Sequence, residues 1–148
     1  MQISTRGRYG LRAMVDLAIY AIDEYVALNT IADRQNISES YLEQLFSALR
    51  KGGLVKSIKG SQGGYALSDH PSRITVGAVL RLLEGKLFVV AESSENELVN
   101  NTIEYCLNEH VWEKINASVC SIVDSITLED LVERYKTLHG NLLPMFYI

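Results

Sequence analysis

Two short amphipathic helices separated by only three residues limit the possible fold of this chain more than any other feature. The first helix is expected to pass through residues 31–34, and residues 35–37 are expected to form a tight turn, in which asparagine tolerates the left-handed region. The second helix is predicted over 39–51, with Ser38 as its cap and two glycines after its end. Its apolar positions follow helical spacing: Leu42, Leu45, Phe46 and Leu49. This is the outline of a helix-turn-helix.

A β-hairpin is predicted directly after the second helix. Residues 54–58 and 65–67 have strand character, and the glycine-rich tract 59–64 between them is typical of a turn. An amphipathic helix over 4–21 precedes the pair. Three helices followed by a hairpin indicate a winged helix-turn-helix, in which the hairpin, or wing, lies along the DNA beside the reading helix.

The rest of the chain is expected to add a dimerisation element. We expect a DNA-binding domain at 1–85, a polar connector at 86–101, a dimerisation helix and a short C-terminal helix within 102–140, and a tail at 141–148. The long helix would extend about 30 Å at 1.5 Å per residue, which exceeds so small a domain. Part of its apolar stripe is therefore expected to pack on a second subunit. The predicted fold class is mainly α with a small β-hairpin wing.

Capping signals place the ends of two of these helices. Asn29 or Thr30 is expected to cap the first helix of the helix-turn-helix. Thr127 is expected to begin the last helix, with Asp130 at the capping-box position, and Gly140 is expected to end it.

Composition excludes several classes of protein. The 148 residues are 47 % hydrophobic and 22 % charged, which suits one compact domain, and no apolar run is long enough to cross a membrane. Two cysteines indicate a reducing compartment, which we take to be the bacterial cytoplasm. The net charge of −4 is uneven: residues 1–65 hold eight Lys and Arg against six Asp and Glu, whereas residues 66–148 hold six against twelve. Enzymatic motifs are missing from the sequence, so an enzyme is not expected.

The polar face of the second helix carries residues that can read bases. Gln44 can form two hydrogen bonds with adenine, and Glu43 can accept one from the cytosine amino group. The hydroxyls of Ser38, Ser40 and Tyr41 can bind phosphates or bases. For any one of these residues, a solvated surface position is an equal alternative.

Basic residues in the first half of the chain are candidates for phosphate contacts. Lys59, at the tip of the hairpin, could enter a narrow minor groove, or could simply keep the turn soluble. The full set of candidates is Arg6, Arg8, Arg12, Arg34, Arg50, Lys51, Lys56 and Lys59.

Five strings of residues occur in a specific order: ISTRGRYG at 3–10, ISESYLEQL at 37–45, LRKGGLV at 49–55, GSQGGY at 60–65 and ITLEDL at 126–131. They resemble the Rrf-two family of bacterial winged-helix regulators. The resemblance implies a homodimer that binds partly palindromic operators and represses transcription. It also implies which residues are the best candidates for DNA contact: Ser38, Ser40, Tyr41, Glu43, Gln44 and Lys59.

The chain departs from the family members that carry an iron–sulfur cluster. Those members resemble one another in three cysteines before the long helix, of which only Cys106 is present here. Glu109 stands where some members have a ligating histidine, with His110 one step later, and Arg8 stands where some have an acidic ligand. One thiolate would hold a cluster poorly, so no cofactor is expected. An adventitious metal bound by Cys106, Glu109 and His110 is left open.

The two thiols also bear on redox sensing. If one helix carries Cys106 and Cys120, their 14-residue separation places them about 21 Å apart, too far for an intrachain disulfide. Oxidation of Cys106 alone or a bridge between subunits is left open, and Cys120 is expected to be a small buried apolar residue.

The tail suggests a protein partner. Phe146, Tyr147 and the terminal Ile148 could dock into cysteine synthase, a class of enzyme known to bind C-termini ending in isoleucine; the equal alternative is that they fold back on the dimer. The chain is similar to family members that lack cluster cysteines and repress cysteine metabolism, so a repressor of cysteine or sulfur metabolism is predicted. The alternatives are a thiol- or metal-sensing stress regulator of the same fold and a winged protein-interaction module that does not bind DNA.

Overall fold

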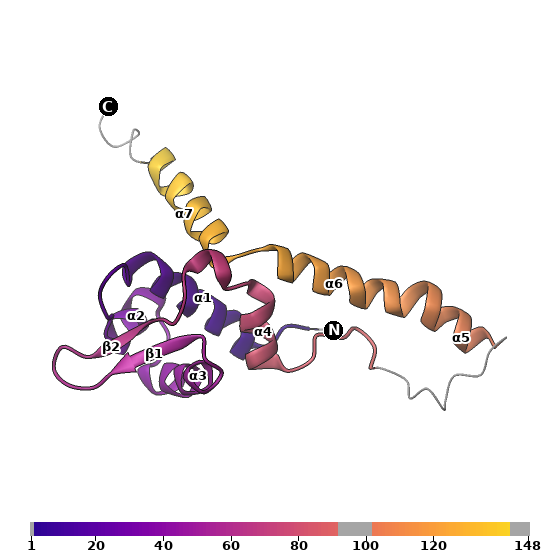
Figure 1. Cartoon of the computed structure of the whole chain (residues 1–148), viewed down its shortest axis with the longest axis horizontal. Coiled ribbons are helices and arrows are strands. Elements are labelled where there is room, and N and C mark those ends of the chain that lie inside the picture. The colour runs from indigo at the N-terminus through magenta and orange to yellow at the C-terminus, as the bar shows by residue number, and fades with distance from the viewer. Residues whose placement is uncertain (1, 92–101, 143–148) are drawn as a thin grey trace.

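The computed structural model of the chain, which describes residues 2–91 and 102–142, is mainly helical, and its one β-hairpin lies at an edge of the N-terminal part (Figure 1). The elements of the N-terminal part are α1 (Thr5–Tyr20), α2 (Leu28–Gln35), α3 (Glu39–Lys51), β1 (Val55–Ile58), β2 (Gly64–Leu67), the 3-10 turn η1 (Pro71–Arg73) and α4 (Val76–Glu84). The elements that follow are α5 (Ile103–Leu107), the π-helical turn η2 (Asn108–Trp112), α6 (Glu113–Ser125) and α7 (Leu128–Leu142). No helix of the described part is long and apolar enough to span a membrane.

Helices α2 and α3 form the predicted helix-turn-helix. Asn36 ends α2 in the left-handed region, with φ of 53°, and the Ser38 hydroxyl caps α3 by accepting a hydrogen bond from the backbone N–H of Tyr41 at 3.3 Å. The predicted cap of α2 is wrong. The helix begins at Leu28 after Ala27, which supplies no side-chain cap, so Asn29 and Thr30 lie in its first turn.

The hairpin pairs with a third extended segment, at Val26, that the sequence did not predict. Strands β1 and β2 pair antiparallel, with Val55 opposite Leu67. On the other side of β2, Val26 and Tyr65 exchange two backbone hydrogen bonds, of 2.9 and 2.8 Å. Gly64 makes this approach possible, because a Cβ there would collide with the carbonyl oxygen of Val26. The base of the wing is therefore fixed to the segment that joins α1 to α2.

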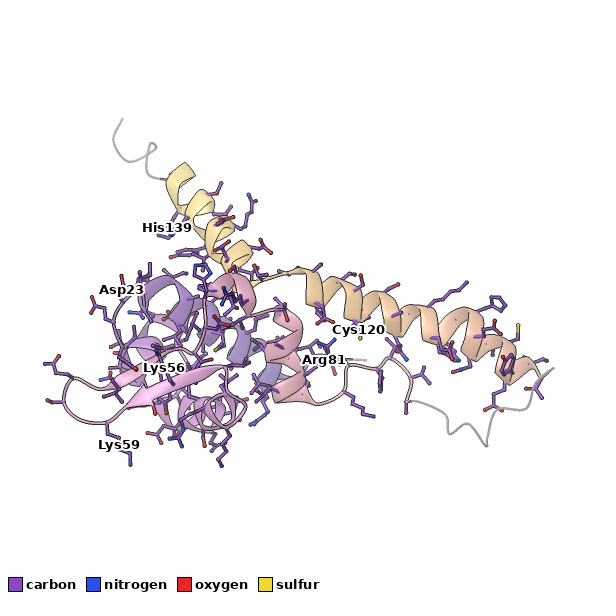
Figure 2. The ribbon with its side chains drawn as sticks, viewed as in Figure 1. Asp23, Lys56, Lys59, Arg81, Cys120 and His139 are labelled. Atoms are coloured by element: carbon purple, nitrogen blue, oxygen red, sulfur yellow. The ribbon has the colours of Figure 1, made fainter. Side chains whose placement is uncertain are left out.

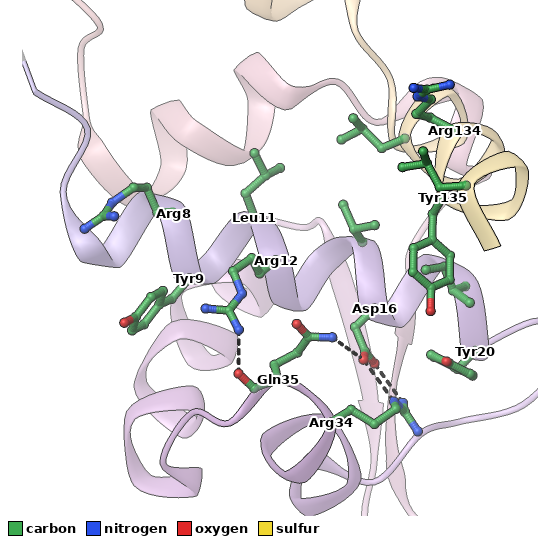
Figure 3. A pocket seen from close by; sticks show the side chains of 14 residues that line it. Arg8, Tyr9, Leu11, Arg12, Asp16, Tyr20, Arg34, Gln35, Arg134 and Tyr135 are labelled. Carbon is green, nitrogen blue, oxygen red and sulfur yellow. Dashed lines mark hydrogen bonds and ion pairs between the residues drawn. The ribbon is translucent and has the colours of Figure 1, made fainter. Parts of the chain in front are cut away.

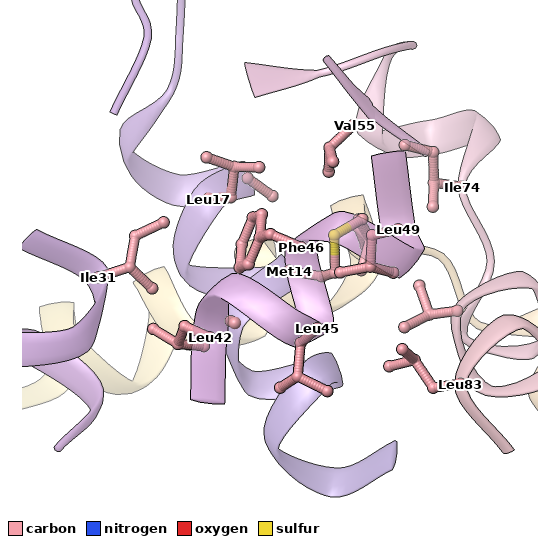
Figure 4. Close-up of a cluster of buried hydrophobic side chains, with 14 of the residues drawn as sticks. Met14, Leu17, Ile31, Leu42, Leu45, Phe46, Leu49, Val55, Ile74 and Leu83 are labelled. Atoms are coloured by element: carbon pink, nitrogen blue, oxygen red, sulfur yellow. The ribbon is translucent and has the colours of Figure 1, made fainter. Parts of the chain in front are cut away.

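The core lies where α1, α2 and α3 meet (Figure 4). Phe46 is fully buried and its ring lies 4.8 Å from that of Tyr65, centroid to centroid, so the core links α3 to the wing. The other large side chains that are fully buried among the described residues are Met14, Leu17, Ile31, Leu42, Leu45, Leu49, Val79, Asp16 and Leu128. All four apolar positions predicted for the second helix belong to this set.

The predicted long helix is present, but one π-helical turn interrupts it. The π-helical turn η2 separates α5 from α6, and together they extend away from the N-terminal part (Figure 1). Arg81 on α4 holds the near end of α6 through two hydrogen bonds to Asp124, of 2.6 and 2.8 Å. Cys120 lies beside the same guanidinium (Figure 2). The connector that was predicted at 86–101 lies partly outside the described residues.

Helix α7 begins as predicted and ends later than predicted. Thr127 donates its backbone N–H to Asp130 and its hydroxyl accepts from the N–H of Asp130, at 2.9 and 3.1 Å, which confirms the capping box. Gly140 does not end the helix, which runs to Leu142. A glycine inside a helix costs only about 1 kcal/mol relative to alanine, so by itself it does not stop one.

Candidate nucleic-acid interface

The outer face of α3 presents three polar side chains to solvent. Ser40, Glu43 and Gln44 are exposed, and their spacing of three and four residues places them on one face of the helix. None of the three side chains makes a hydrogen bond to another described residue, so all their donors and acceptors are available. The face combines a hydroxyl, a carboxylate and an amide, which suits contacts with base edges in a major groove.

Two further predicted contacts on α3 have structural roles. The Ser38 hydroxyl accepts the capping hydrogen bond and is exposed, which leaves its own proton free for a phosphate. Tyr41 differs from the expectation of an outward residue. Its ring is half-buried and meets the ring of Tyr9 edge-on, with the centroids 6.3 Å apart, so only part of the ring faces outward.

The wing that follows α3 carries two exposed lysines. Lys59 is exposed at the tip of the turn, where Gly60 adopts a φ of 112°. Lys56 is exposed on β1, with its ammonium nitrogen 6.0 Å from the centre of the Tyr25 ring. Figure 2 shows Lys59 pointing away from the protein at the end of the hairpin. Arg50 and Lys51, in the last turn of α3, are also exposed.

Arg34 does not join this set, although the sequence placed it among the phosphate contacts. Its guanidinium donates to both oxygens of Asp16, at 2.9 and 2.7 Å, and stacks 3.8 Å from the centre of the Tyr20 ring (Figure 3). Asp16 is 1 % exposed and accepts a third hydrogen bond, from Gln35 at 2.9 Å. The hydrogen bond with Asp16 raises the pKa of Arg34. Arg34 therefore fixes α2 to α1.

The arginines of α1 also have contacts within the protein. Arg6 is half-buried and donates to the carbonyl oxygen of Leu83 at 3.2 Å, which connects α1 to α4. Arg12 donates to the carbonyl oxygen of Gln35 at 2.5 Å. Arg8 is exposed and lines a hollow between α1 and α7. Phosphate binding by Arg6 and Arg8 stays a prediction.

The cysteines do not fit an iron–sulfur cluster. Cys106 on α5 is exposed, and Cys120, the other cysteine of the chain, lies on α6 beside Arg81. Within residues 2–91 and 102–142, no group of three or more His, Cys, Asp or Glu side chains is placed to hold a metal ion. A cluster held mainly by thiolates therefore lacks its ligands.

A reading helix with a free polar face, followed directly by a lysine-tipped hairpin, defines a winged helix-turn-helix regulator. The chain belongs to the Rrf2 family, whose model, described as "Iron-dependent Transcriptional regulator", matches residues 3–134.

Similar proteins place the chain within this family. It is 44 % identical to the transcriptional regulator CymR of Bacillus subtilis over 131 residues, which cover 88 % of this chain and 89 % of CymR. It is 39 % identical to IscR of Yersinia enterocolitica over 138 residues, which cover 93 % of this chain and 83 % of IscR. The solved structure of B. subtilis CymR, titled "the Global Cysteine Regulator", matches with a TM-score of 0.76, 41 % identity and coverage of 90 % and 98 % of the two chains. This match confirms the predicted fold class.

Proposed function

We propose that the chain is a homodimeric, DNA-binding transcriptional repressor of the bacterial cytoplasm. The observation that carries the proposal is a free polar face on α3 in a helix-turn-helix that is followed directly by a wing with two exposed lysines. In this arrangement Gln44 and Glu43 read base edges in the major groove, and Lys59 contacts the backbone or minor groove beside it. Arg50 and Lys56 supply further positive charge for phosphates.

Two substitutions separate base reading from phosphate binding. Gln44→Ala removes an amide that can bind adenine through two hydrogen bonds, so it should relax base preference at one position by about 1–3 kcal/mol. Lys59→Ala should weaken binding to all sequences and reduce the slope of log affinity against log salt by about 1. Lys136→Ala on α7 is the matched control, because Lys136 is exposed on another element.

Footprinting and anisotropy titration on fragments from upstream regions of its own genome measure both effects. The unsubstituted chain should protect discrete sites at low ionic strength, and the control should bind equally well. Failure of the unsubstituted chain to protect any fragment would overturn the proposal and favour a protein-interaction module. A Lys59→Ala variant with unchanged affinity and salt slope would remove the wing from the interface.

The homodimer is supported by apolar side chains that the single chain leaves in solvent. Ile103 is 81 % exposed on α5, and Ile122 is 60 % exposed on α6. Leu107 and Ile115 lie on the same helical segment and are 43 % and 37 % exposed. Several large apolar side chains exposed along one helical segment indicate a site of protein association.

A role in cysteine or sulfur metabolism is supported by the likeness to CymR and by the lack of cluster ligands. The predicted docking of the tail into cysteine synthase concerns Phe146, Tyr147 and Ile148, which lie outside the described residues. Calorimetric titration of cysteine synthase into the chain with and without Tyr147 and Ile148 measures it directly. Equal binding by both forms would reject the docking.

Thiol sensing is the second candidate, favoured by one observation: Cys106 is exposed on a helix next to the π-helical turn. Peroxide treatment followed by mass spectrometry should then detect sulfenic acid at Cys106 and weaker DNA binding. The Cys106→Ser variant should keep its DNA affinity under peroxide. Equal loss of binding by both proteins would reject Cys106 as the sensor.

A further inference from the structure

Arg12 joins α1 to the turn of the helix-turn-helix. Its guanidinium donates to the carbonyl oxygen of Gln35, the last residue of α2, at 2.5 Å. The same guanidinium lies 5.1 Å from the centre of the Tyr9 ring, which is within the range of a cation–π contact (Figure 3). One exposed side chain therefore binds both a backbone carbonyl of the turn and an aromatic ring of α1.

The Tyr9 ring in turn contacts the reading helix. It meets the Tyr41 ring edge-on, with the ring planes at 87°, which is a favoured arrangement for two aromatic rings. Tyr41 lies in the first turn of α3, where its backbone N–H donates to the capping hydroxyl of Ser38. The contacts of Arg12, Tyr9 and Tyr41 therefore connect the end of α2, the first half of α1 and the start of α3.

The position of Tyr41 determines where the reading face of α3 lies. Ser40 is its neighbour in the chain, and Gln44 follows it by three residues. A shift of the first turn of α3 therefore moves both polar side chains relative to a base edge. Hydrogen bonds to base edges tolerate little displacement, because they require a donor–acceptor distance near 3 Å. Phosphate contacts by a flexible lysine tolerate more.

The hydroxyls of the two tyrosines allow a second role, which is direct contact with DNA. Neither the Tyr9 nor the Tyr41 hydroxyl forms a hydrogen bond with another described residue. Within residues 2–91 and 102–142, no buried side-chain oxygen or nitrogen lacks a partner, so both hydroxyls reach solvent. Removing a hydroxyl while keeping its ring therefore separates the two roles.

We propose that Arg12 and Tyr9 are positioning residues for DNA recognition. Through the Tyr41 ring they fix the start of α3, so that the exposed side chains of α3 meet the base edges. The proposal rests on the DNA binding proposed above. Arg12 then acts within the protein, whereas the sequence placed it among the phosphate contacts. The two roles of Arg12 predict different losses, because a phosphate contact carries no sequence information and base reading does.

Substitutions at both residues test the proposal. Arg12→Ala removes the hydrogen bond to Gln35 and the cation–π contact, and Arg12→Lys keeps the charge but not the planar guanidinium. Tyr9→Leu removes the aromatic ring, whereas Tyr9→Phe removes only the hydroxyl. A double variant carries Arg12→Ala and Tyr9→Leu. Arg73→Ala is the matched control, because Arg73 is an exposed arginine in η1, outside the helix-turn-helix.

Fluorescence anisotropy at several salt concentrations measures the binding of each full chain to two duplexes. One duplex is enriched from a random pool by the unsubstituted chain, and the other has the same base composition in shuffled order. Thermal unfolding followed by circular dichroism checks that each variant is folded at the assay temperature. The ratio of the two affinities gives the preference for the enriched duplex.

Arg12→Ala and Tyr9→Leu should each reduce this preference about tenfold, the size expected for the loss of one hydrogen bond from a charged group. Affinity for the shuffled duplex and the slope of log affinity against log salt should stay unchanged. The double variant should lose about as much as either single variant, since both act through Tyr41. Arg12→Lys should lose part of the preference. Tyr9→Phe and Arg73→Ala should bind like the unsubstituted chain.

Other results would overturn the proposal. Equal weakening of Arg12→Ala on both duplexes, with a salt slope reduced by about 1, would assign Arg12 to a phosphate. Equal loss of preference by Tyr9→Phe and Tyr9→Leu would assign the Tyr9 hydroxyl to a direct DNA contact. Unchanged preference in both Arg12 variants would also reject the positioning role. In these three cases the DNA-binding function stands, whereas an unsubstituted chain that enriches no duplex would reject that function and this proposal with it.

Discussion

Removing Arg34 should destabilise the protein strongly, although the residue lies partly at the surface. Asp16 is 1 % exposed and accepts three hydrogen bonds, two of them from Arg34. Arg34→Ala leaves this buried carboxylate with the single donor of Gln35. Removing one partner of a buried ion pair costs about 3–5 kcal/mol, and the 28 % exposure of the Arg34 side chain places the cost near the lower end, about 3 kcal/mol. For a chain of this length, that loss lowers Tm by about 10 °C.

Thermal and urea unfolding followed by circular dichroism measure this loss. Arg73→Ala is the matched control, because Arg73 pairs with Asp69 at 3.4 Å on the surface and its removal should cost less than about 1 kcal/mol. A loss below 1 kcal/mol for Arg34→Ala, together with weaker DNA binding, would refute the structural role. That result would instead favour the phosphate contact that the sequence predicted for Arg34.

Three further substitutions report on other parts of the fold. Phe46→Ala should cost about 3–5 kcal/mol in urea unfolding, because its fully buried ring joins α3 to the wing; a loss under 1 kcal/mol would contradict that packing. Gly64→Ala should weaken DNA binding and lower Tm, since a methyl group there collides with the Val26 carbonyl, and an unchanged Tm would argue against the third extended segment. The hydrogen bond from Arg81 lowers the pKa of Asp124 in the folded state. The contribution of the Arg81–Asp124 pair to the free energy of unfolding is therefore present above the unfolded pKa of about 3.9 and is lost as pH falls further. The Asp124→Asn variant should be less stable than the parent at neutral pH and equally stable in strong acid. Parallel curves at all pH values would contradict the pairing.

Local signals in the sequence were sufficient for the helix-turn-helix and the wing. The cap at Ser38, the left-handed turn at Asn36 and the apolar spacing of α3 each act within a few residues. The structure confirms all three. The free polar face of α3 follows from the same periodicity, because burial of Leu42 and Leu45 turns Ser40, Glu43 and Gln44 outward on the opposite side of the helix.

Long-range contacts account for most of what the sequence could not predict. From the sequence alone, Arg34 is expected to be a surface cation. Only the fold brings it to Asp16, which lies 18 positions earlier in the chain. Val26 looks like part of a loop because its strand partner, Tyr65, comes from the wing. Tyr9 and Tyr41 likewise meet only after α1 packs on α3.

Weak local signals account for the remaining differences. Helix α2 begins at Leu28 without any side-chain cap, so the capping residues that follow it suggested too late a start. Gly140 was expected to end α7, but the helix continues to Leu142. The π-helical turn at Asn108–Trp112 inserts into a regular apolar pattern that gives no sign of it.

Selection of DNA sequences from a pool of random duplexes tests the central claim most directly. If α3 reads the major groove and two copies bind together, the full chain should enrich an inverted repeat. The centres of its half-sites should lie about 10 base pairs, or a multiple of one helical turn, apart. The Gln44→Ala variant should lose preference at a defined position within each half-site. Failure to enrich any sequence at low ionic strength, under conditions where the protein is folded, would contradict the account.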